Sequence, residues 1–126
     1  MAGGNTNFMS GVPELMVLRL LQDREMYGYE IVQAIQAQSR GALSFGEGVV
    51  YPVLHALEKD GALKSQRREV SGRSRVYYSL TSRGVRRLFD LTDSWTATAQ
   101  AIHLVLKGGA PVQGGARPLA KAAPSS

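Results

Sequence analysis

The basic side chains of this 126-residue sequence are concentrated in one segment. Residues 62–87 contain eight basic residues and one acidic residue, Glu69, a net charge of +7, whereas the rest of the chain has seven basic and nine acidic residues. Seven of the eight basic residues are arginines, whose planar guanidinium group can bind a phosphate group through two parallel hydrogen bonds. A cluster of charges is often only a solvated surface. The arginine content favours a surface that binds the phosphate backbone of a nucleic acid.

Side chains suited to catalysis are few. The sequence has no cysteine, which excludes disulfides, thiol catalysis and cysteine-based metal sites, and it has two histidines, His55 and His103. Neither histidine belongs to a His-x-x-x-His motif, and the sequence has no glycine-rich phosphate loop. Glu58 and Asp60 are typical of solubilising charges at the end of a helix. We therefore expect a protein that is not an enzyme and that uses no metal and no cofactor.

Three helices are predicted in the first half of the chain. Apolar residues recur at helical spacing over residues 11–23 and again over residues 28–39. The third helix is expected to begin near Glu47 and to end before Gly61, because glycine is favoured just past the end of a helix.

The third predicted helix has two dissimilar sides. One side is apolar and suits a protein core; it comprises Val50, Val53, Leu54 and Leu57. The other side has small or flat groups and one full positive charge; it comprises Gly48, Tyr51, Pro52, His55 and Lys59. Pro52 is expected to kink or loosen the first turns, at a cost of roughly 3 kcal/mol if it lies deep in the helix. Two simpler interpretations stay open: an exposed His55 without a role, and a Tyr51 half-buried against the second helix.

After Gly61 the hydrophobic period changes from about 3.6 residues to about 2 residues. The segments ALKSQRREV and RVYYSL flank a Ser-Gly pair and predict a two-stranded hairpin with its turn at that pair. Thr81 then suits the cap of a fourth helix that runs to about Leu106. The apolar line of this helix needs a partner, which a homodimer would supply. The line is formed by Leu88, Leu91, Trp95, Ile102 and Val105.

Three helices followed by a hairpin are the element order of a winged helix-turn-helix. The predicted fold class is therefore mainly α with a small β-hairpin. A winged helix-turn-helix DNA-binding domain at residues 10–81 would precede a long C-terminal dimerisation helix at residues 82–106. In this architecture the third helix enters the major groove, and the hairpin lies on the neighbouring backbone or in the minor groove. The expected DNA-binding residues are Gly48, Tyr51, Pro52, His55, Lys59, Arg67, Arg68, Arg73, Arg75 and Tyr77.

The two ends of the chain differ in composition from the middle. Residues 1–9 and residues 107–126 have too few apolar side chains to offset the entropy of ordering them, so a flexible N-terminus and a disordered tail are expected. The first residues lack the basic start and unbroken apolar run of a secretory signal, and no run of about 18 uncharged apolar residues occurs. A soluble cytoplasmic protein is the expectation.

Three blocks of the sequence occur in a specific order and spacing. They are MYGYEIVQAI, VVYPVLHALEKDGAL and GRSRVYYSLTSRG, on the second helix, the third helix and the hairpin. Together they resemble the PadR family of bacterial transcriptional regulators, in which the corresponding motifs are YGYEI, TLYP-x-L-x-x-LE-x-x-G and GR-x-R-x-YY-x-LT-x-x-G. The match extends over roughly residues 13–91. The family's usual TLYP is Val49-Val50-Tyr51-Pro52 here, so a hydroxyl group at the start of the helix is absent.

The resemblance implies a homodimeric repressor that binds a near-palindromic operator and is released by a small effector, such as a planar aromatic molecule. The DNA-contacting blocks of the family correspond to Tyr51 and His55 on the third helix and to Arg73 and Arg75 on the wing. Trp95 matches the aromatic residue that some multidrug-responsive members place at the dimer centre to stack on flat ligands. A Trp95 that only fills the core is the alternative. The expected effector site comprises Trp95, Leu91, Thr98 and Ala99.

A second class of function stays open. A winged-helix protein-interaction or architectural module, without sequence-specific DNA readout, would also contain the arginines and the apolar last helix. It accounts less easily for the small residues on the third helix. The two classes differ in selectivity, because a specific regulator prefers its operator over random duplex by about 10³-fold or more.

Overall fold

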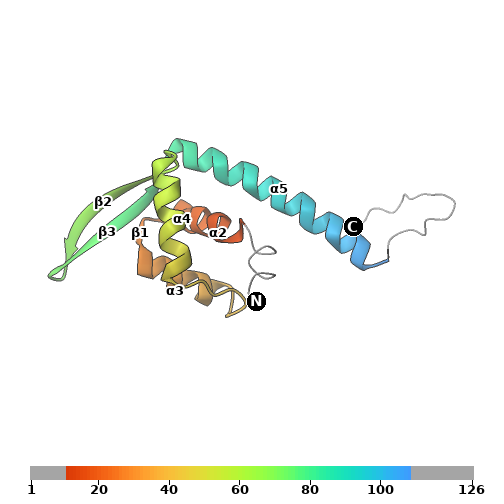
Figure 1. Ribbon diagram of the computed structural model, residues 1–126, viewed down its shortest axis with the longest axis horizontal. Coiled ribbons are helices and arrows are strands. Elements are labelled where there is room, and N and C mark those ends of the chain that lie inside the picture. The colour runs from red at the N-terminus through yellow and green to blue at the C-terminus, as the bar shows by residue number, and fades with distance from the viewer. Residues whose placement is uncertain (1–10, 109–126) are drawn as a thin grey trace. The chain divides into compact units, whose positions relative to one another are not determined.

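The structure is a computed structural model that describes residues 11–108. The expectations for residues 1–9 and for the tail beyond Gly108 lie outside the described residues. The chain divides after Thr92 into two compact units, and the division falls inside the last helix. The elements labelled in Figure 1 are α2 (Val12–Asp23), β1 (Met26–Tyr27), α3 (Gly28–Gln38), α4 (Glu47–Lys59), β2 (Leu63–Val70), β3 (Arg73–Leu80) and α5 (Ser82–Leu106).

The described elements confirm the predicted fold class. Four helices and one three-stranded sheet are present within residues 11–108, and the helices begin and end close to the predicted positions. In the same part of the chain, no helix is both long enough and apolar enough to cross a membrane.

The helices of the first unit pack around one hydrophobic core. The apolar side predicted for α4 is confirmed, because Val50, Leu54 and Leu57 are buried and Val53 packs partly against them. α4 is continuous through Pro52 and begins at Glu47, so the proline lies inside the helix, where it has no N–H to donate to the preceding turn. The largest fully buried side chains are Leu18, Ile31, Leu54, Val17 and Val50.

The sheet has the strand order β1-β3-β2, whereas the sequence predicted only the hairpin of β2 and β3. β1 (Met26–Tyr27) pairs antiparallel with Tyr78 and Tyr77 of β3. So short a strand directly before a helix has no alternating pattern that the sequence could reveal. The predicted turn is confirmed, since Ser71 and Gly72 have φ values of 53° and 76°, as a type I′ hairpin turn requires.

One hydroxyl group connects the end of α4 to the beginning of α5. Thr81 Oγ1 accepts the backbone N–H of Gly84 at 3.1 Å, as an N-cap does, and donates to the carbonyl oxygen of Gly61 at 2.7 Å. The backbone N–H of Thr81 donates to the carbonyl oxygen of Ala62 at 3.1 Å. A β-carbon at Gly84 would collide with that same carbonyl oxygen. The predicted cap is confirmed, and these contacts explain the threonine and the glycine of the LTSRG sequence.

Candidate nucleic-acid interface

α4 lies beside the hairpin of β2 and β3 (Figure 1). Gly48, Pro52, His55 and Lys59 are all exposed, as the sequence predicted for this side of the helix. A β-carbon at Gly48 would meet nothing within 4 Å in the described part of the chain. Packing within residues 11–108 therefore does not require glycine at this position, and a small residue there leaves room for a binding partner.

Tyr51 differs from its neighbours on this side of α4 because it is half-buried. Its ring packs against the backbone of Gly28, the first residue of α3, where a β-carbon would overlap the ring. Burial, with smaller contributions from Glu47 and Tyr27, raises the pKa of the Tyr51 hydroxyl above its ordinary value. The phenol is therefore protonated at neutral pH and can donate a hydrogen bond. The centroids of the Tyr51 and His55 rings are 6.2 Å apart.

The predicted wing arginines do not share one face of the hairpin. Successive residues of a strand alternate between faces, and the register pairs Arg68 with Arg75 and Arg67 with Val76. Arg68 and Arg75 therefore lie on one face. Arg67 lies on the other face, where its Nη1 donates to Ser74 Oγ at 3.2 Å.

Two tyrosine rings support the face that contains Arg68 and Arg75. The guanidinium carbon of Arg75 lies 4.2 Å from the centroid of the Tyr27 ring, and that of Arg68 lies 5.2 Å from the centroid of the Tyr77 ring. The two rings meet edge to face with their centroids 5.4 Å apart. Arginines and rings thus form one continuous row across β1, β3 and β2.

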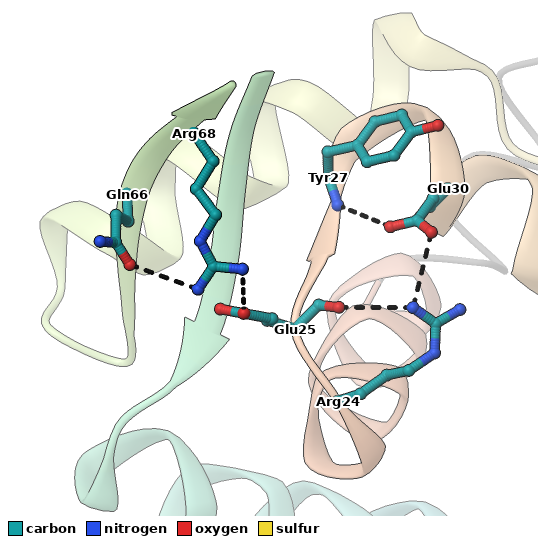
Figure 2. A network of polar contacts seen from close by, with 6 residues as sticks. All are labelled: Arg24, Glu25, Tyr27, Glu30, Gln66 and Arg68. Atoms are coloured by element: carbon teal, nitrogen blue, oxygen red, sulfur yellow. Dashed lines mark hydrogen bonds and ion pairs between the residues drawn. The ribbon is translucent and has the colours of Figure 1, made fainter. Parts of the chain in front are cut away.

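Arg68 also forms an ion pair with Glu25, shown in Figure 2, between Nη1 and Oε2. Its Nη2 donates to Gln66 Oε1 at 3.4 Å. Glu25 directly precedes β1 and Arg68 belongs to β2, so the ion pair connects the two edge strands of the sheet across β3. This contact could not be predicted from the sequence, because β1, which positions Glu25, is too short to have a recognisable strand pattern.

A second group of polar contacts in Figure 2 organises the start of α3. The backbone N–H of Tyr27 donates to Glu30 Oε1 at 3.1 Å, and Arg24 Nη1 lies 3.5 Å from Glu30 Oε2. Arg24 Nη1 also donates to the carbonyl oxygen of Glu25 at 3.5 Å. A glutamate three residues after the N-cap is a known signal for the start of a helix, and Glu30 has this position relative to Tyr27. This contact could therefore have been predicted from the sequence.

Part of the basic segment is already paired with carboxylates of the same chain. Arg83 Nη2 lies 3.5 Å from Asp60 Oδ1, and Arg87 pairs with Glu14 and, at 3.8 Å, with Asp60. All ten acidic side chains of the sequence lie within residues 11–108, so their ion pairs with described basic residues are all visible. Within those residues, the basic side chains of the segment that have no carboxylate at ion-pair distance are Lys64, Arg67, Arg73, Arg75 and Arg86.

The predicted apolar line of α5 begins with two residues, Leu88 and Leu91, that pack against their own chain. Leu88 is buried in the core of the first unit, and Leu91 packs against that core. The exposed part of the predicted apolar line therefore begins at Trp95, in the second unit. Trp95 and Ile102 are each 47% exposed, and Val105 is 77% exposed, so these apolar side chains are unpartnered within the described residues.

Three of the expected effector residues lie in the second unit. Trp95, Thr98 and Ala99 are spaced so that they share one face of α5. Trp95 and Thr98 are exposed and Ala99 is half-buried. Trp95 therefore does not fill the core of its own chain.

Both histidines lie on the surface of helices. His55 is exposed on α4, and His103 is exposed on α5. Within residues 11–108, no three histidine or carboxylate side chains are grouped so that they could hold a metal ion.

The sequence of this chain matches a known protein family. The pattern described as "Transcriptional regulator PadR-like family" matches residues 17–90. The transcriptional regulator Rv3488 of Mycobacterium tuberculosis is 36% identical over 77 residues, which cover 61% of this chain and 69% of that protein.

Solved structures agree with the sequence comparison. A transcriptional regulator from Clostridium thermocellum superimposes with a TM-score of 0.72 at 28% identity, over 77% of this chain and 95% of that one. A PadR family transcription regulator from Clostridium difficile gives a TM-score of 0.65 at 28% identity, over 76% of this chain and 99% of that one. Members of this family are DNA-binding transcriptional regulators and not enzymes. The expectation of a non-enzymatic protein is confirmed, and this chain belongs to the PadR-like family of transcriptional regulators.

Proposed function

We propose that this chain is a homodimeric repressor that binds a near-palindromic operator in double-stranded DNA and is released by a small effector. Residues 10–81 would form the DNA-binding domain and residues 82–106 the dimerisation helix. One observation carries the DNA-binding part. α4, whose Gly48, His55 and Lys59 are exposed, lies beside the β2–β3 hairpin. On this hairpin Arg67, Arg73 and Arg75 have no carboxylate at ion-pair distance within residues 11–108.

α4 is proposed to read the major groove. The small surface at Gly48 and the flat ring of Pro52 allow close approach to base edges. His55 can bond a base edge or a phosphate, and Lys59 can bind a phosphate. The Tyr51 hydroxyl, protonated and held against α3, can donate to a phosphate from a fixed position.

The wing is proposed to bind the DNA backbone. Arg73 directly follows the turn at the tip of the hairpin, and Arg75 is stacked on the Tyr27 ring. A guanidinium group that is already held by an aromatic ring loses less freedom when it binds a phosphate. Arg67 would reach the backbone from the opposite face of the hairpin.

The homodimer is proposed from the second unit of the chain. Trp95, Ile102 and Val105 expose large apolar surfaces on one helix, and a second copy of the same helix would remove them from water. Two α4 helices in such a dimer would have to lie roughly 34–36 Å apart to enter successive major grooves on one face of DNA.

The effector is proposed to be a planar aromatic molecule that stacks on Trp95. Thr98 and Ala99 would provide a small, partly polar surround on the same helix face. Trp95 is the only tryptophan of the chain, so its emission reports directly on this site. Saturable quenching by aromatic compounds would support the proposal, and no saturable change across a broad panel would overturn it.

Competition binding tests the proposed function as a whole. The purified protein is bound to labelled DNA from the promoter beside its own gene and challenged with the same unlabelled fragment or with mixed-sequence duplex. A repressor should prefer a promoter fragment by about 10³-fold or more. Equal competition by all duplexes would instead support an architectural module that does not read sequence.

A further inference from the structure

Arg68 differs from the other wing arginines in its electrostatic partner. Glu25 neutralises Arg68, whereas Arg67, Arg73 and Arg75 have no carboxylate at ion-pair distance within residues 11–108. The side chains of Arg68 and Glu25 are 40% and 36% exposed, so solvent reaches the pair. A phosphate group forms the same charge-assisted hydrogen bonds to a guanidinium group, so it would compete with Glu25 for Arg68 and would be repelled by the Glu25 carboxylate as it approached.

We propose that Glu25 limits the number of phosphate groups that the wing binds, by holding the guanidinium group of Arg68 in an ion pair within the chain. This inference rests on the proposed DNA-binding function and deepens it. Glu25 engages Nη1 of Arg68, and the side chain of Gln66 engages Nη2. Both terminal nitrogen atoms of the guanidinium group thus have partners before DNA arrives.

Two features of the sheet support this arrangement of Arg68. The pairing of β1 with β3 fixes the position of Glu25 at the edge of the sheet. The Tyr77 ring lies 5.2 Å from the guanidinium carbon of Arg68 and supports it from β3. The side chain of Arg68 is therefore directed along the sheet toward Glu25.

The consequence is a lower affinity for DNA of any sequence. Phosphate contacts account for nearly all non-specific binding, and each contact releases a counterion. A wing that binds through Arg67, Arg73 and Arg75 makes fewer such contacts than one that also uses Arg68. A genome offers very many competing sites, so a regulator benefits when its affinity for random DNA is low.

The test measures binding to a labelled mixed-sequence duplex by fluorescence anisotropy over a series of salt concentrations. Glu25→Gln should free Arg68 and steepen the slope of log K against log salt by about 0.9 for each wing that contacts DNA. Across a fourfold rise in salt, this equals about a 3.5-fold greater loss of affinity for each wing. Arg68→Gln alone should leave the slope unchanged, and adding it to Glu25→Gln should restore the wild-type slope.

Glu69→Gln is the matched control. Glu69 follows Arg68 on the same strand, is exposed, and has no ion-pair partner within residues 11–108. This variant removes the same charge as Glu25→Gln but frees no arginine, so its slope should equal that of the wild type. Glu25→Ala is the second test variant, because a glutamine could still accept a hydrogen bond from Arg68. Thermal melting of every variant should be close to that of the wild type, since exposed ion pairs contribute little to stability.

The outcomes separate this inference from the function on which it rests. An unchanged slope in both Glu25 variants overturns the inference while DNA binding stands. A shallower slope for Arg68→Gln alone also overturns it, because Arg68 would then already contact a phosphate in the wild type. Absence of duplex binding by the wild-type protein at low salt overturns the DNA-binding function and the inference together.

Discussion

The ring of Tyr51 lies against the backbone of Gly28, at a position where any β-carbon would overlap it. Gly28 belongs to the MYGYEI block on α3, and Tyr51 belongs to the VVYP block on α4. The glycine of one block is therefore explained by the tyrosine of the other. This contact joins α4 to the start of α3 and fixes the direction in which Tyr51 points.

Replacing Gly28 with alanine should displace the Tyr51 ring. We expect a loss of about 1–2 kcal/mol in the free energy of unfolding, because overpacking outweighs the better helix propensity of alanine. Urea denaturation measures the change. Gly48→Ala is the control: this glycine is also helical but has open space around it, so alanine there should stabilise by about 0.5–1 kcal/mol. Equal effects at the two sites would contradict the packing described here.

Replacing Gly84 with alanine should be more damaging than the same change at Gly28. The atom that an added β-carbon would meet is the carbonyl oxygen of Ala62, which belongs to the backbone and cannot rotate away like a ring. We expect a loss of about 3 kcal/mol, measured by urea denaturation. Ser82→Ala, an exposed position in the same turn, should change stability little. A Gly84→Ala protein as stable as the wild type would contradict the close contact between Gly84 and the carbonyl oxygen of Ala62.

The stability of the protein should fall at alkaline pH through Tyr78. Burial, with smaller contributions from Glu58 and Tyr51, raises the pKa of the Tyr78 hydroxyl above its ordinary value near 10. In the unfolded chain the Tyr78 hydroxyl loses its proton above about pH 10, whereas in the native state it keeps the proton to a higher pH. The contribution of this group to the free energy of unfolding is therefore fully present below about pH 10 and is lost as the pH rises further. Tyr78→Phe should flatten this decline in urea denaturation between about pH 8 and about pH 11. Comparison of the two proteins at neutral pH controls for packing, and parallel alkaline declines would contradict the assignment to Tyr78.

The wing and α4 should affect DNA binding in different ways. Arg73→Ala or Arg75→Ala should weaken binding to operator and to random duplex alike, because phosphate contacts carry no sequence information. Tyr51→Ala or His55→Ala should reduce the preference between the two DNAs, because His55 can bond a base edge and the Tyr51 ring fixes how α4 is held against α3. Competition binding measures both quantities. Equal loss of discrimination in the two pairs of variants would show that the proposed division of roles is wrong.

A charge on the apolar face of α5 should weaken self-association. Ile102→Glu and Val105→Glu place a carboxylate among side chains that are proposed to be buried between two copies. We expect at least about tenfold weaker dimerisation, which corresponds to about 1.4 kcal/mol, measured by sedimentation analysis. Gln100→Glu on the same helix is the control, since that position is polar and exposed. A wild-type chain that is monomeric at working concentrations would overturn the dimer itself.

The parts of the fold that local patterns determine could be predicted from the sequence. The apolar side of α4 follows from helical spacing, the turn at Ser71 and Gly72 from its residue types, and the cap at Thr81 from its position before an apolar helix. Each of these depends on residues that are close together in the chain. Helical periodicity and the residue types of turns and caps were therefore enough to predict these three features.

The parts that depend on pairing between distant residues could not be predicted. Strand alternation alone places Arg67 and Arg68 on opposite faces, but only the register shows that Arg68 shares its face with Arg75. The partners of Arg68 and Arg87 are Glu25 and Glu14, which only the folded chain brings near. Net charge per segment is therefore a poor measure of how much positive charge a partner would meet.

The Thr81 hydroxyl oxygen connects the end of α4 to the start of α5. This atom donates to the carbonyl oxygen of Gly61, just past α4, and accepts the N–H of Gly84 in the first turn of α5, so a relative rotation of the two helix ends would strain these two hydrogen bonds. Movement of the first turn of α5 is therefore coupled, through one oxygen atom, to the backbone that directly follows α4.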